Sequence, residues 1–177
     1  IADAPMHQEI NVTGYIAKAA EFDPDNYSKE WNAKYLALAK TFANWSKDPS
    51  TQVGAVAIGS CGQVLSQGYN GFPKGFDDSK SIYNNPELKN KYIIHAEMNC
   101  IYHATLNGIS LQGATLFVYG LDICHECAKG VIQVGIEEVI TYSTKALKDK
   151  WVSSFKTSKE LLQKSNINHI NIHKNKF

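Results

Sequence analysis

The sequence contains no hydrophobic run near the roughly 20 residues that a helix needs to cross a bilayer. Cysteine is scarce: four residues in 177 are too few for a disulfide scaffold and favour reduced thiols or metal ligands. The first residues lack the basic and apolar regions of a signal peptide. We therefore expect no membrane span and a cytoplasmic location.

Charge of one sign is not in excess either, because 18 basic against 17 acidic side chains leave a net charge of +1. A protein that holds duplex nucleic acid or anionic lipid through bulk charge is more basic than this. We therefore do not expect a nucleic-acid partner, although a small anionic ligand remains compatible with this balance.

The chain has the length of one domain. A hydrophobic content of 44% and an aromatic content of 11% exclude wholesale disorder. Residues 1–28 are mostly polar and are expected to form an N-terminal arm. Residues 29–177 are then expected to form a single domain around one core.

The first half of that domain predicts a helix, a hairpin and a loop. Apolar side chains at steps of four and three within residues 31–45 place one apolar stripe on a helix. Two apolar runs flank a turn at residues 60–62, so strands over 53–58 and 64–69 are expected to form a hairpin. Residues 70–92 hold glycine and proline among polar side chains and predict a long loop.

The second half alternates helices with strands. In chain order we expect a helix over 95–107, a strand over 114–119, a helix over 124–134, a strand over 139–142, a helix around 147–162 and an edge strand over 169–173. A hairpin followed by helix–strand units predicts a three-layer α/β/α sandwich with a mixed sheet of about five strands.

Two short motifs at predicted helix starts contain residues that can bind a metal or take part in catalysis: His95-Ala96-Glu97 and Cys124-His125-Glu126-Cys127. Zinc prefers imidazole and thiolate ligands, and a catalytic zinc takes three protein ligands plus water. His95, Cys124 and Cys127 supply three. The first turn of a helix favours thiolate over thiol, because its free N–H groups and the helix dipole are positive there.

Glu97 is expected to do something other than bind the metal. Positions i and i+2 lie about 200° apart around an ideal helix, so His95 and Glu97 do not project together. Glu97 is then free to face the water on the zinc. We expect it to act as a proton shuttle, which takes a proton from that water and delivers it to a leaving amine.

Other interpretations of these motifs remain open. A structural zinc would need a fourth ligand, for which Cys61 and Cys100 are the candidates. A single Cys-x-x-Cys also occurs as a redox pair. A non-catalytic zinc-binding scaffold is a further alternative, and Glu97 separates it from an enzyme because a scaffold has no use for that carboxylate.

The two motifs together resemble the signature of the zinc-dependent cytidine deaminase family, H-x-E followed by P-C-x-x-C. The similarity extends over roughly residues 31–142. More of the chain resembles one branch of this family, the deoxycytidylate (dCMP) deaminases. Four segments carry it: residues 46–49 with 52–55, residues 68–75, residues 95–99, and residues 127–129 with 132–136. One departure is Ile123, where the family has proline; because proline needs no N–H partner at a helix entrance, we expect Ile123→Pro to be tolerated.

This resemblance implies hydrolytic deamination of a cytosine nucleotide, most directly dCMP and water to dUMP and ammonia, with one Zn²⁺ per chain. Zinc-bound hydroxide would attack C4 of the ring, with Glu97 as the catalytic residue. Alternative substrates are dCTP, CMP, a free nucleoside or a nucleic-acid base. The family also implies a homo-oligomer, often a hexamer, with dCTP as activator and dTTP as inhibitor.

The resemblance further implies which residues bind the nucleotide. Asn70 is expected to hold the sugar and base, and the backbone of Ala96 to meet the pyrimidine edge. Val53, Gly54 and Ala55 are expected to form part of the pocket floor. Lys47 and Ser46 are expected to meet the 5′-phosphate.

Overall fold

The computed structural model describes residues 31–145 and 149–173. The predicted arm over residues 1–28 lies outside these described residues. None of the helices within them combines the length and the hydropathy needed to cross a bilayer.

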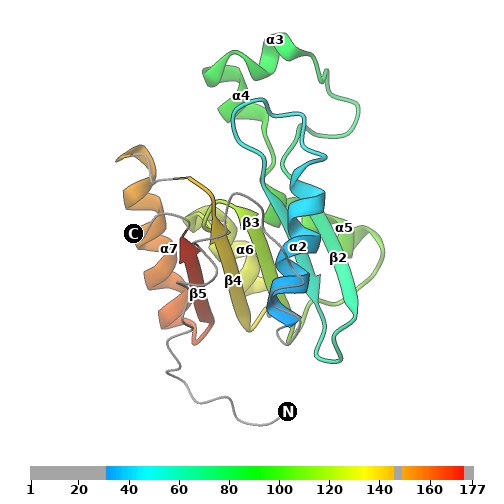
Figure 1. The fold of residues 1–177 in the computed structure, drawn as a ribbon, viewed down its shortest axis with the longest axis vertical. Helices are drawn as coiled ribbons and strands as arrows, with labels where there is room; N and C mark the ends of the chain where they lie inside the picture. The colour runs from blue at the N-terminus through cyan, green and yellow to red at the C-terminus, as the bar shows by residue number, and fades with distance from the viewer. Residues whose placement is uncertain (1–30, 146–148, 174–177) are drawn as a thin grey trace.

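A five-stranded mixed sheet forms the centre of the fold (Figure 1). In chain order its strands are β1 (Gly54–Ile58), β2 (Val64–Tyr69), β3 (Thr115–Gly120), β4 (Glu138–Ser143) and β5 (Asn168–His173). Their spatial order is β2-β1-β3-β4-β5, with β1 antiparallel to both neighbours and β3, β4 and β5 parallel. The predicted hairpin, mixed sheet and final edge strand are confirmed.

Helices cover both faces of this sheet. The helices of the described residues are α2 (Trp31–Ala43), α3 (Lys80–Tyr83), α4 (Pro86–Tyr92), α5 (Ala96–Leu106), α6 (His125–Gln133) and α7 (Asp149–Lys164), of which α2, α5, α6 and α7 pack on the sheet. Strand alternation divides the core: Val56 and Ile58 of β1 pack with α2, whereas Ala55 and Ala57 pack on the face covered by α5, α6 and α7. The predicted three-layer sandwich is confirmed.

The predicted long loop over residues 70–92 is wrong in part, because it contains α3 and α4. The Asn85 side chain accepts hydrogen bonds from the N–H groups of Glu87 and Leu88, and Pro86 occupies the start of α4. These start signals are present in the sequence, but Gly71, Pro73 and Gly75 before them favour a loop. Figure 1 shows α3 and α4 together beyond one end of the sheet.

Candidate active site

Three metal-binding side chains meet where α5 and α6 begin. His95 is the N-cap residue of α5, Cys124 is that of α6, and Cys127 lies in the first turn of α6. The Nδ1 atom of His95 is 3.4 Å from the Sγ atom of Cys124 and 3.4 Å from that of Cys127. All three ligand atoms lie within 4.8 Å of one another. The tertiary structure therefore brings together the three ligands predicted from two separate motifs.

The spacing of these atoms fits zinc. A tetrahedral zinc with its usual bond lengths to nitrogen and sulfur separates the two ligand atoms by about 3.5 Å, close to the 3.4 Å between His95 and each cysteine. Within residues 31–145 and 149–173 this is the one such cluster of three His, Cys, Asp or Glu side chains. Cys61 is exposed and Cys100 is buried elsewhere on α5, so neither supplies the fourth ligand of a structural zinc.

The three ligand side chains influence one another's protonation. A hydrogen bond from Cys127, and a further one from His95, lower the pKa of Cys124 to about 4 despite its burial. The same contact with Cys124 raises the pKa of His95 to about 9. The pKa of Cys127 is raised by its hydrogen bond to Cys124 and by burial. One thiolate thus forms readily, whereas His95 and Cys127 must each release a proton before all three side chains can bind a cation.

Glu97 lies beside the cluster without belonging to it. Its side chain is only 3% exposed and lines the same pocket as His95 and Cys124. Burial raises the pKa of Glu97 to about 7, with His95 opposing this shift and Cys124 reinforcing it. A carboxyl group that titrates near neutral pH can both accept and return a proton, as general acid–base catalysis requires.

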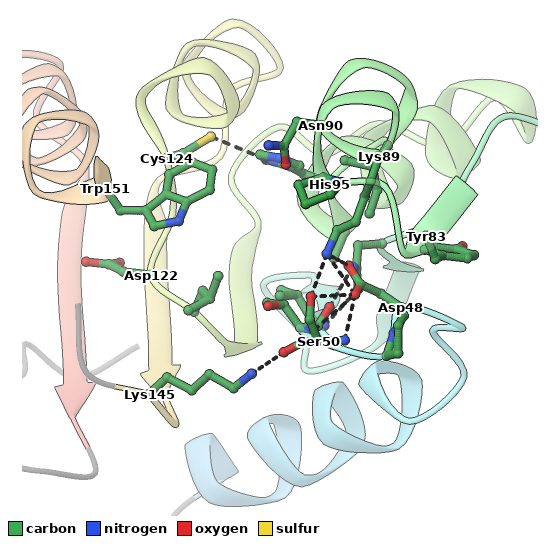
Figure 2. Close-up of a pocket in the computed structure, with 18 of the residues that line it drawn as sticks. Asp48, Ser50, Tyr83, Lys89, Asn90, His95, Asp122, Cys124, Lys145 and Trp151 are labelled. Atoms are coloured by element: carbon green, nitrogen blue, oxygen red, sulfur yellow. Dashed lines mark hydrogen bonds and ion pairs between the residues drawn. The ribbon is translucent and has the colours of Figure 1, made fainter. Parts of the chain in front are cut away.

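The cluster opens into a pocket of about 460 Å³, within the usual range for small-molecule sites (Figure 2). Its wall is built by the segment before β1, by α4, by the starts of α5 and α6, by the end of β4 and by α7. The lining residues used below are Asp48, Ser50, Thr51, Val53, Asn70, Lys89, His95, Ala96, Glu97, Leu121, Asp122, Cys124, Lys145, Trp151 and Phe155.

Three of the predicted nucleotide-binding residues line this pocket: Val53, Asn70 and Ala96. The Asn70 side chain also holds the adjoining wall in place. Its Oδ1 accepts a hydrogen bond of 2.8 Å from the N–H of Val53, and its Nδ2 donates one of 2.9 Å to the carbonyl of Thr51. Asn70 therefore shapes the segment that enters β1 as well as facing the pocket.

The two residues predicted to meet a phosphate do not line the pocket. Lys47 has a side chain 66% exposed, and its Nζ lies 2.5 Å from a carboxylate oxygen of Asp78. Ser46 is buried, and its hydroxyl donates to the carbonyl of Asn70 at 2.8 Å. An ion pair outside the pocket and a buried structural hydrogen bond account for these two side chains.

Two of the three predicted floor residues also lie outside the pocket lining. Gly54 packs directly under α2, where an added Cβ would lie 2.0 Å from the carbonyl oxygen of Ala39. Ala55 is fully buried in the core on the face covered by α5 and α6. The small side chains of this segment thus serve helix packing, and Val53 alone reaches the pocket.

Sequence reasoning missed the basic side chains that do line the pocket. Lys89 of α4 forms a buried ion pair with Asp48. Lys145 follows β4 and donates a hydrogen bond to the carbonyl of Ser50. Because this carbonyl is neutral, the contact does not balance the positive charge of Lys145. Lys89 lay in the predicted loop and Lys145 beyond the region of family resemblance, so neither spacing nor a motif marked them.

The helix entrance at Ile123 differs from the expectation that proline would fit there. The N–H of Ile123 donates a 2.8 Å hydrogen bond to Oδ1 of Asp122. Proline would remove this donor. Because this hydrogen bond would be lost, Ile123→Pro is now expected to destabilise the protein rather than to be tolerated.

Three potential metal ligands that open into a pocket, with no fourth beside them among the described residues, fit a catalytic rather than a structural zinc site and place the protein among metal-dependent enzymes. The model of the cytidine and deoxycytidylate deaminase zinc-binding region matches residues 29–143. The chain belongs to this family.

Relatives of known sequence agree with this assignment. A protein named probable deoxycytidylate deaminase from Drosophila melanogaster is 35% identical over 167 residues, which cover 87% of this chain and 79% of the relative. The deoxycytidylate deaminase of Homo sapiens is 39% identical over 121 residues. That match covers 66% of each chain, so the chain spans just under two thirds of the human protein's length.

Solved structures support the fold. The dCMP deaminase of cyanophage S-TIM5 in its apo form superposes with a TM-score of 0.61 at 23% identity, covering 80% of this chain and 96% of the other. Its complex with dCMP and dUMP gives a TM-score of 0.61 at 24% identity, covering 78% of this chain and 94% of the other. At this level of identity the comparison establishes the shared sandwich architecture.

Proposed function

We propose that this protein is a zinc-dependent hydrolase that deaminates dCMP, converting dCMP and water to dUMP and ammonia. The observation that carries the proposal is the convergence of His95, Cys124 and Cys127 beside the buried Glu97 in one pocket. The relatives from Drosophila melanogaster and Homo sapiens bear the name deoxycytidylate deaminase, with the former qualified as probable, and so point to dCMP among the cytosine compounds.

The ligand set and Glu97 divide the chemistry between them. When bound by His95, Cys124 and Cys127, zinc would lower the pKa of a water molecule and so supply a nucleophile at neutral pH. Glu97 would accept a proton from that water and pass protons to the ring and to the departing amine. In the balanced reaction the water oxygen becomes bonded to C4, the bond from C4 to the amino nitrogen breaks, and ammonia leaves.

The pocket also offers a site for the 5′-phosphate. The chain has 18 lysines and no arginine, so a side chain that is fully charged at neutral pH and meets the phosphate is a lysine. Lys145 and Lys89 line the pocket, whereas Lys47 does not. Asp48 balances the charge of Lys89, so Lys145 is the favoured phosphate contact. Asn70 and the backbone of Ala96 remain the proposed contacts to sugar and base, because both line the same pocket.

A substrate panel tests this function. The rates to compare are those for dCMP, CMP, dCTP, deoxycytidine and a short single-stranded oligonucleotide, followed by the absorbance change of the base. We expect kcat/KM for dCMP to exceed that for deoxycytidine by about 10-fold to 100-fold, the worth of one charge-assisted phosphate contact. Equal values for these two would contradict the nucleotide assignment, and a preference for dCTP or the oligonucleotide would reassign the substrate.

Assembly, regulation and location belong to the same proposal. We propose a homo-oligomer, with a hexamer as the form to test, that is activated by dCTP and inhibited by dTTP. Sedimentation of the full chain, with and without each nucleotide, measures the first point, and dCMP turnover under the same conditions measures the second. A cytoplasmic location is also proposed, since all four cysteines are free and thiols persist in a reducing compartment.

A further inference from the structure

A buried carboxylate lies next to the zinc ligands and takes no part in the chemistry proposed above. Asp122 lies two residues before Cys124, between β3 and α6, and its side chain is 10% exposed. Its carboxylate accepts hydrogen bonds from four donors: the N–H of Ile123 at 2.8 Å, the hydroxyl of Thr141 at 2.9 Å, Nε2 of His169 at 3.0 Å, and the side-chain amide of Asn171.

These contacts explain how the carboxylate is accommodated. Burial alone would raise the pKa of Asp122, but the hydrogen bond and charge of His169, together with the other donors, hold that pKa below its usual range. Asp122 is outside the group of side chains that could hold the metal. Figure 2 shows its carboxylate directed toward the side of β4 and β5. Asp122 is thus neither a ligand nor a candidate base.

Three of the four donors lie on strands of the sheet, and the fourth lies in the turn before α6. Thr141 lies on β4, and His169 and Asn171 lie on β5, the edge strand that ends the described chain. The fourth donor is the backbone of Ile123, immediately before Cys124. Asp122 therefore connects the turn that carries a zinc ligand to two neighbouring strands, one of them 47 residues away in sequence.

The turn that Asp122 holds contains no proline to restrict its backbone. The residue before Cys124 is Ile123, whose φ angle is not fixed by a ring. Its side chain is fully buried, and its N–H is bonded to Asp122, so both the side chain and the peptide plane are held. Cys124 then enters α6 in an extended conformation, with φ −78° and ψ 163°, and its sulfur faces His95.

We propose that Asp122 is a positioning residue, which keeps Cys124 in its ligand geometry by tying the Ile123 amide to β4 and β5. The proposal rests on the ligand set of the proposed function. It follows that β5, which contributes no ligand, contributes to metal affinity. Hydrogen-bonding partners around metal ligands typically account for about 10-fold to 100-fold in affinity when they are removed.

The test compares three variants of the whole 177-residue chain with the parent. Asp122→Ala removes the acceptor, and Asp122→Asn keeps its shape and one oxygen while removing its charge. Ile172→Val is the matched control, because Ile172 lies on the same strand as His169 but packs in the core beneath α2. Zinc affinity is measured by competition with a chelator, and the ligand geometry by the visible absorption of the cobalt-substituted protein.

We expect zinc affinity to fall in the order parent, Asp122→Asn, Asp122→Ala, with a loss of about 10-fold or more for alanine, and the cobalt bands to shift in the same order. Ile172→Val should lower the melting temperature and leave both metal readouts at parent values. Neither the zinc titration nor the cobalt spectrum involves a substrate. Failure of the dCMP assay would therefore contradict the proposed function without contradicting the positioning role of Asp122.

Two results would overturn the proposal. One is a folded Asp122→Asn or Asp122→Ala protein with the zinc affinity and cobalt spectrum of the parent, which would make Asp122 a stabiliser of the strands only. The other is an equal loss of zinc affinity in Ile172→Val, which would make the effect a consequence of general destabilisation.

Discussion

The Nζ atom of Lys89 lies 2.6 Å from Oδ2 of Asp48, and this ion pair joins α4 to the segment that precedes β1 (Figure 2). The side chain of Asp48 is 1% exposed and that of Lys89 is 14% exposed. The other carboxylate oxygen of Asp48 accepts hydrogen bonds from the N–H groups of Ser50 and Thr51. One buried carboxylate thus organises a wall of the pocket and anchors α4 against it.

Asp48→Asn should destabilise the protein in a pH-dependent way. Burial would raise the pKa of Asp48, but the hydrogen bonds from Lys89 and Ser50 outweigh it and hold that pKa below its usual value. A lowered pKa in the folded state means that the carboxylate stabilises the fold above its unfolded pKa of about 4, and that this contribution is lost as the pH falls through the folded value. At pH 7 the substitution leaves the Lys89 ammonium without its counter-charge, at a cost of about 3 kcal/mol.

Urea unfolding of the parent and of Asp48→Asn between pH 3 and pH 7 measures this effect. The difference in unfolding free energy should be largest near neutral pH and shrink below about pH 4. Ile58→Val, in the core beneath α2, serves as the control, since its cost should not depend on pH. A constant difference for Asp48→Asn across this range would contradict the assignment.

Zinc content should separate the four cysteines into two pairs. Cys124→Ala and Cys127→Ala remove ligands and should lose the metal, whereas Cys61→Ser and Cys100→Ser should keep one zinc per chain. Metal analysis of the purified variants decides the matter. Loss of zinc from either serine variant would identify a fourth thiolate ligand and a structural site.

Glu97→Gln should separate metal binding from turnover. The substitution keeps the size of the side chain, and Glu97 is not a ligand, so zinc should remain bound. The rate constant kcat for dCMP should fall by about 10²-fold to 10⁴-fold, the usual worth of a positioned acid–base group. A variant that retains zinc and turns over within a few-fold of the parent would contradict the proton-transfer role.

Lys145→Ala should reduce kcat/KM for dCMP by about 10-fold to 100-fold and leave deoxycytidine nearly unchanged, because only dCMP carries the phosphate. Lys47→Ala is a matched control: it removes the same side chain outside the pocket, where Lys47 pairs with Asp78. If Lys47→Ala produced the selective loss and Lys145→Ala did not, the phosphate would lie at the position expected from family resemblance.

The sequence alone predicted most of the elements and the metal ligands, because their signals are local. Alternating and helical periodicities depend on neighbouring residues, and they placed the strands of the sheet and the helices around it within a few residues. His95, Cys124 and Cys127 were recognisable because their residue types and their positions at helix starts suit zinc. Gly108 and Gly135, at φ +66° and +77°, close α5 and α6 as expected for helix C-termini.

Only the tertiary structure decided which polar side chains surround those ligands. Lys89 and Asp48 are 41 residues apart, and His169 and Asp122 are 47 residues apart, so no periodicity or short motif relates them. Lys47 suited a phosphate on resemblance, yet the chain turns it toward Asp78 outside the pocket. The physical reason is that such contacts depend on how whole helices and strands pack against one another, whereas helix starts and strand alternation depend only on nearby residues.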